Sequence, residues 1–109
     1  MKPLPTAEWI AQLFDYSIDK YGGETTLNEL RVINQITICY LRGITPCWFA
    51  CLVSNTPVKR STISYAVARL VQRGYICEEI DPRDRRKRLI YLTESFAADV
   101  RRHFKSLPE

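Results

Sequence analysis

The residues of this chain best suited to binding chemistry are cations crowded into DPRDRRKRLIYLTESF, residues 81–96. The cluster comprises Arg83, Arg85, Arg86, Lys87 and Arg88. Like charges this close repel one another, and a polyanion such as nucleic acid would relieve that repulsion. A basic face that is merely solvated is the alternative that charge alone leaves open.

The charge of the whole chain is placed unevenly. Residues 58–105 carry twelve basic and six acidic side chains, whereas residues 1–57 carry four basic and five acidic ones. The second half therefore suits a polyanionic partner.

Candidate catalytic and metal-binding residues are sparse. The four cysteines (Cys39, Cys47, Cys51, Cys77) form no C-x-x-C pair, and His103 is the single histidine of the sequence. No nucleophile–base pair or phosphate-cradling glycine loop is present, so we predict no enzyme, no catalytic residue, no metal and no cofactor. Oxidant sensing by cysteine and zinc binding with His103 are weaker interpretations than thiols packed in a core. Cys47 and Cys51 are expected four residues apart on one helix.

The chain length of 109 residues fits a single domain. No apolar run reaches the roughly 20 residues that span a bilayer, and the N-terminus lacks the apolar core of a signal peptide. We therefore expect a cytoplasmic protein without membrane association.

Helices dominate the expected secondary structure. Periodicity predicts a first helix over 6–21, and Thr26 with Glu29 forms a capping box that opens a second helix. Gly43 is expected to end that second helix. Two Thr-Pro starts follow, at Thr45 and Thr56, and predict a short helix, a tight turn and a longer helix. This layout over 45–73 is a helix-turn-helix.

The longer helix, 57–73, has two different faces. Its apolar side is expected to pack inward and consists of Ile63, Ala66, Val67, Leu70 and Val71. Its other side is polar, short-armed and basic near its start, and includes Lys59, Arg60, Ser61, Thr62, Ser64, Tyr65 and Arg69. Backbone N–H groups in its first turns could also meet a phosphate.

A two-stranded ribbon is predicted after Gly74, over 75–92, with strands at 75–80 and 88–92 and the basic loop at its tip. Thr93 then caps a last helix, 93–107. The apolar stripes of the two terminal helices exceed what one small domain can cover, so we expect them to form a dimer interface. The two stripes together consist of Trp9, Ile10, Leu13, Phe14, Phe96, Val100, Phe104 and Leu107.

The whole pattern resembles the multiple-antibiotic-resistance regulator (MarR) family of bacterial transcription factors, of which this would be a short member. The stretches TLNELRVI, STISYAVARLVQRGYI and DPRDRRKRLIYLTESF carry the resemblance. The most specific feature is a D-x-R tip followed by a strand ending in Leu-Thr. The resemblance implies a mainly α fold with a small β-hairpin wing, a winged helix-turn-helix, in one domain spanning 1–109.

The resemblance also implies roles for individual residues. Asp84 would brace the wing, and Arg86 would reach into the minor groove. Further wing contacts would come from Arg83, Arg85, Lys87 and Arg88. Major-groove contacts would come from Lys59, Arg60, Ser61, Thr62, Ser64 and Tyr65.

The expected function is sequence-specific binding of double-stranded DNA by a homodimeric repressor that reads a palindromic operator. A small-molecule effector is compatible with the family but is not identified by the sequence. The alternative is a winged-helix adaptor that binds an acidic partner protein and has only weak, non-specific DNA affinity.

Overall fold

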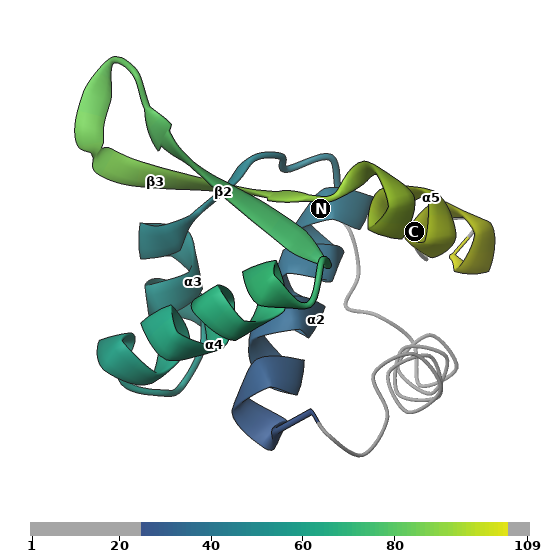
Figure 1. Ribbon diagram of the computed structural model, residues 1–109, viewed down its shortest axis with the longest axis horizontal. Coiled ribbons are helices and arrows are strands. Elements are labelled where there is room, and N and C mark those ends of the chain that lie inside the picture. Colours follow the sequence, from purple (N-terminus) through teal and green to yellow (C-terminus); the bar gives the residue numbers. More distant parts are fainter. Residues whose placement is uncertain (1–24, 105–109) are drawn as a thin grey trace, which may run out of the picture.

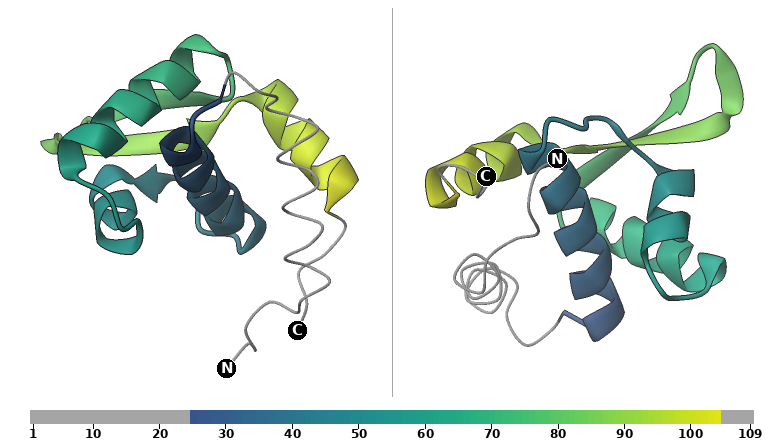
Figure 2. Two further views of the ribbon diagram at one scale, coloured as in Figure 1. Left: turned by 90° about the horizontal axis from the view of Figure 1, so that it is seen from below. Right: turned by 180° about the vertical axis from the view of Figure 1, so that it is seen from behind.

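The computed structural model describes residues 25–104, which form helices around one small sheet (Figure 1). The elements, in chain order, are α2 (Leu27–Leu41), β1 (Cys47–Trp48), α3 (Phe49–Asn55), α4 (Arg60–Gln72), β2 (Ile76–Asp81), β3 (Asp84–Leu92) and α5 (Glu94–His103). This confirms the predicted fold class, mainly α with a β-hairpin wing. The wing, residues 76–92, projects away from the helices on one side, and α5 extends on the other (Figures 1 and 2).

The sheet is antiparallel, with the strand order β1-β3-β2. Cys47 pairs with Ile90 and Trp48 with Leu89, so the short β1 lies along the base of β3. Two wing strands were predicted from the sequence, whereas the described residues contain three. The third was missed because a two-residue strand has no sequence periodicity of its own.

The capping box of α2, the glycines after α2 and α4, and the cap of α5 are present as predicted. The hydroxyl of Thr26 accepts a hydrogen bond from the Glu29 backbone N–H, and the Glu29 carboxylate accepts one from the Thr26 backbone N–H. Gly43 and Gly74 follow the ends of α2 and α4 with φ of +79° and +82°. A side chain is strained in this left-handed region, which explains glycine at both helix ends. The predicted cap of α5 is also present, because Thr93 Oγ1 accepts from Phe96 N.

The core lies where α2, α3, α4 and α5 meet the base of the sheet. Its members include Val32, Ile33, Ile36, Leu52, Ile63, Val67, Leu70, Ile76, Ile90 and Val100. Of the predicted inward face of α4, Ile63, Ala66, Val67 and Leu70 are buried, but Val71 is exposed. Val71 was assigned wrongly because the apolar stripe of α4 is narrower near its end.

Both Thr-Pro helix starts were wrong. Thr45 and Pro46 precede β1, and α3 begins at Phe49. The ladder between β1 and β3 therefore overrides the local capping signal, and Cys47 lies on a strand rather than on one helix with Cys51. Helix α4 begins at Arg60, because residues 56–59 make the turn, in which Val58 N donates to Thr56 O.

The basic cluster is not confined to a loop. Strand β3 begins at Asp84, so Arg85 to Arg88 lie on the strand, and Pro82 and Arg83 occupy the turn. Alternating side chains on a strand point to opposite faces, which separates neighbouring cations more than a compact loop would.

Several predictions fall outside the described residues: the helix at 6–21, with Trp9, Ile10, Leu13 and Phe14, and also Leu107. Phe96, Val100 and Phe104 are described and are buried within this single chain. Their expected exposure as an uncovered stripe is therefore wrong, because the domain core covers them. Their contact with a second copy stays a prediction.

A buried carboxylate connects α2 to the end of α4. Glu29 is 2% exposed, and its Oε1 lies 3.6 Å from Arg73 Nη1 and 3.9 Å from Arg69 Nε. Arg73 Nη1 also donates to Thr25 Oγ1 at 2.6 Å. One side chain thus caps α2 and fixes the position of α4.

We expect Glu29→Ala to lower the free energy of unfolding by about 1–3 kcal/mol. The lost cap accounts for about 1 kcal/mol, and the ion pairs add a modest amount because both arginines are partly exposed. Glu29→Gln keeps an acceptor for the cap and should cost less. Urea unfolding measures both, with exposed Glu79→Ala as the control. A Glu29→Ala protein as stable as wild type would contradict this role.

Candidate nucleic-acid interface

The outer face of α4 presents the residues predicted to contact DNA bases. Lys59, Arg60 and Ser61 are exposed, Thr62 and Ser64 are half-buried, and the Tyr65 side chain is 67% exposed. No side chain caps the first turn of α4, and that turn carries no acidic residue. This end of α4 is therefore electropositive and open to an anion.

The turn of the wing is held by two aspartates. Asp81 Oδ1 accepts from the Arg83 backbone N–H at 2.9 Å. Asp84 accepts from the Arg86 backbone N–H at 3.1 Å and from the Arg86 guanidinium at 3.0 and 3.2 Å. These hydrogen bonds from Arg86 hold the pKa of Asp84 below its usual 3.8, because they stabilise the ionised carboxylate. Asp84 is thus placed to brace the wing, and the Arg86 side chain remains 90% exposed.

Further along the wing, Arg88 pairs with Glu78 across the two strands. Its Nε and Nη2 both lie 2.7 Å from Glu78 Oε2. The pair holds the guanidinium of Arg88 near the base of the wing, on the side of α3.

Two aromatic residues that the sequence reasoning did not assign to the site lie beneath the cations. Lys87 Nζ lies 4.3 Å from the centroid of the Trp48 ring. Arg88 Cζ lies 4.0 Å, and Arg60 Cζ 5.0 Å, from the centroid of the Phe49 ring. The start of α4 and the wing strand therefore meet at one ring, which places the two predicted DNA-binding surfaces side by side. The only sequence signal for this pair is the adjacency of the two aromatic residues, Trp48 and Phe49.

These residues line a groove of about 70 Å³. The lining consists of Trp48, Phe49, Ala50, Arg60, Arg86, Lys87 and Arg88. We call it the cationic groove.

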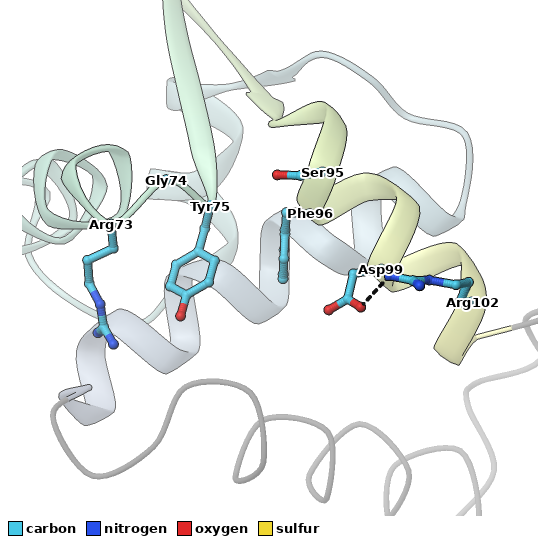
Figure 3. A pocket seen from close by; sticks show the side chains of 7 residues that line it. All are labelled: Arg73, Gly74, Tyr75, Ser95, Phe96, Asp99 and Arg102. Carbon is cyan, nitrogen blue, oxygen red and sulfur yellow. Dashed lines mark hydrogen bonds and ion pairs between the residues drawn. The ribbon is translucent and has the colours of Figure 1, made fainter.

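A larger hollow of about 290 Å³ lies between the end of α4 and α5 (Figure 3). Its lining is Arg73, Gly74, Tyr75, Ser95, Phe96, Asp99 and Arg102. The rings of Tyr75 and Phe96 pack edge to face, with their centroids 5.2 Å apart. Arg102 Nη2 lies 3.0 Å from Asp99 Oδ1. We call it the α5 hollow. It combines aromatic surface with two guanidinium groups.

Two buried thiols, Cys39 on α2 and Cys47 on β1, interact with each other. Cys47 donates a hydrogen bond to Cys39, which lowers the pKa of Cys39 to about 6 despite its burial. The same hydrogen bond, together with burial, raises the pKa of Cys47. The described cysteines are all free thiols, and residues 25–104 contain no cluster of three or more metal-ligating side chains.

Comparison with known proteins identifies the domain. Residues 53–95 match the family model described as a winged helix DNA-binding domain. A curated relative, the HTH-type transcriptional repressor NicR of Pseudomonas putida, is 41% identical over 70 residues, which are 64% of this chain and 44% of NicR. This chain therefore spans less than half the length of that relative.

Solved structures share the fold. The PcaV transcriptional regulator of Streptomyces coelicolor is 26% identical, with a TM-score of 0.60 over 86% of this chain and 65% of PcaV. MepR of S. aureus, solved in complex with DNA, has a TM-score of 0.60 and is 18% identical, over 88% of this chain and 73% of MepR. A MarR regulator from Methanosarcina mazei Go1 has a TM-score of 0.57 and is 21% identical, over 88% of this chain and 71% of that protein.

Residues 53–95 therefore belong to a winged-helix DNA-binding domain, and the relatives that share this fold are transcriptional regulators. The resemblance predicted from the sequence is confirmed as a likeness to a curated transcriptional repressor and to the fold of solved MarR regulators. Within residues 25–104, no helix is long and apolar enough to span a membrane. The contacts of individual residues with DNA stay predictions.

We expect nuclear magnetic resonance to find the carboxyl carbon of Asp84 titrating below pH 3.8. The Arg86 cation favours the ionised form, so more acid is needed to protonate Asp84. In Arg86→Ala the titration midpoint should rise towards 3.8. In Arg85→Ala, which removes a neighbouring charge without a bond to Asp84, the midpoint should stay low. An unchanged midpoint in Arg86→Ala would contradict the bracing geometry.

Proposed function

We propose that this protein is a sequence-specific, double-stranded-DNA-binding transcriptional repressor that acts as a homodimer on a palindromic operator. In this proposal the outer face of α4 lies in the major groove and the wing lies at the adjacent minor groove. The protein would act in the bacterial cytoplasm, where the chromosome is.

The observation that carries the proposal is the shared position of Arg60 and Arg88 over the Phe49 ring. It puts the exposed start of α4 and the cationic strand of the wing on one continuous surface. A merely solvated basic face does not require cations from two separate elements to converge. The uncapped first turn of α4 adds backbone N–H groups to the same surface.

The proposal predicts different effects for two sets of variants. Arg86→Ala should weaken binding to operator and unrelated duplexes alike, because a wing contact with the minor groove is largely independent of sequence. Ser61→Ala or Tyr65→Ala should instead change the preferred sequence, with base discrimination altered by about 1–3 kcal/mol at the contacted position. Selection from a random duplex pool, followed by anisotropy titrations, measures both effects.

The same titrations test the assembly. Two chains should bind each selected duplex, and the two half-sites should repeat about one helical turn, roughly 34 Å, apart. Arg31→Gln, an exposed charge change on α2, serves as the control. Absence of duplex binding at low salt would refute the proposed function, and binding without sequence preference would favour the adaptor alternative.

We also propose that a small aromatic acid binds in the α5 hollow and alters DNA affinity. PcaV has been solved in complex with its natural ligand. Here the half-buried Tyr75 ring and the guanidinium groups of Arg73 and Arg102 line the hollow, with Arg102 held by Asp99. The hollow adjoins Gly74, where α4 leads into the wing, so an occupant would contact the junction of the two DNA-binding elements.

We expect a panel of aromatic carboxylates to contain a member that raises the melting temperature. At a concentration of 100 Kd the ligand would add about 2.7 kcal/mol of stability. Arg102→Gln should weaken the effect, and the methyl ester of the same compound should lack it. Differential scanning fluorimetry provides the measurement. Equal stabilisation by acid and ester would argue against a charge-recognising site.

A further inference from the structure

The cationic groove lies between the two elements proposed to enter the DNA grooves. It is formed by the end of β1, the start of α3, the first residue of α4 and residues 86–88 of the wing. A protein that reads a major groove with one element and the adjacent minor groove with another must straddle the sugar–phosphate strand between them. The cationic groove occupies the corresponding place between the reading elements.

The aromatic rings explain why these cations stay together. Arg60, Lys87 and Arg88 would otherwise repel one another, but each lies within 5.0 Å of the centroid of the Trp48 or Phe49 ring. A cation at this distance from a ring face is held by about 0.5–2 kcal/mol. Phe49 is buried, and Trp48 is 44% exposed, so both rings form the floor of a surface feature.

The carboxylates near the groove leave part of its charge uncompensated. Asp84 pairs with Arg86, and Glu78 pairs with Arg88. Within residues 25–104, neither Arg60 nor Lys87 forms an ion pair. These two cations come from α4 and from the wing, and both line the cationic groove. The groove is thus a preformed site for one anionic group.

We propose that the cationic groove binds one backbone phosphate of the DNA strand that separates the two reading elements. Arg60 and Lys87 contact the phosphate, while Trp48 and Phe49 act as positioning residues that hold the cations in place. This inference rests on the proposed function, because it takes the occupant to be duplex DNA. It also gives Trp48 and Phe49 a role in DNA binding, although neither residue is predicted to contact a base.

The experiment neutralises one phosphate at a time. Duplexes of the selected sequence carry a single methylphosphonate at successive positions, and anisotropy gives the affinity of each. One backbone position per half-site should lower the affinity of the wild type by about tenfold, the size of one charge-assisted contact. The methylphosphonate at that position should lower the affinity of Lys87→Gln or Arg60→Gln little further, because these variants have already lost the contact.

Salt dependence provides a second readout. Because both chains of the dimer carry the substitution, Lys87→Gln or Arg60→Gln should reduce the slope of log affinity against log salt by about 1.8, the value for two phosphate contacts. Trp48→Leu keeps an apolar side chain but removes the ring under Lys87, so it should lower affinity and also shift the slope. Arg31→Gln should change neither quantity. Circular dichroism confirms that each variant is folded.

The outcomes separate this inference from the proposed function. If the wild type binds no duplex, the proposed function fails first. Suppose instead that the wild type binds a specific duplex, and that every methylphosphonate lowers the affinity of Lys87→Gln and Arg60→Gln by the same factor as that of the wild type. The phosphate site is then refuted, while the proposed function stands. If free phosphate competes as well for Lys87→Gln as for the wild type, the groove is likewise not the site.

Discussion

The pairing of the two-residue strand β1 with the base of β3 is the constraint on which the rest of the binding surface depends. Trp48 pairs with Leu89, and this pairing also fixes the position of the neighbouring residues. Phe49, the first residue of α3, therefore lies beside Arg88. Without this pairing, the wing would be a hairpin tethered only at its ends. With it, the wing, α3 and the start of α4 form one unit.

The second fixed point is the Glu29 carboxylate, at the opposite end of α4. It lies between α2 and the arginines of the last turns of α4, while Arg60 at the first turn lies over Phe49. The reading helix is therefore held at both ends, and its middle, around Tyr65, stays exposed. A helix held in this way can present side chains to DNA without repositioning, which lowers the entropic cost of binding.

The sequence predicted the fold because its strongest signals are local. The capping box at Thr26, the glycines after α2 and α4, and the Thr93 cap all act within one helical turn, and all are present in the structure. The errors have a different cause. Thr45-Pro46 looks like a helix start, but a ladder to residues more than 40 positions away competes with it and prevails. The Glu29 tie to Arg73 and the rings under the cations are also long-range, so no periodicity in the sequence indicates them.

The crowding of like charges on the wing is relieved by the structure itself, without DNA. Extended strand geometry spreads Arg85 to Arg88 over two faces, Asp84 and Glu78 each take one guanidinium, and Trp48 and Phe49 hold cations through their ring faces. Carboxylates alone could have removed the repulsion, but they would also have cancelled the attraction for an anion. An aromatic ring stabilises a cation without neutralising it, because the ring carries a quadrupole and no net charge. The free protein can thus keep Arg60 and Lys87 close together while their full charge remains available to a polyanion.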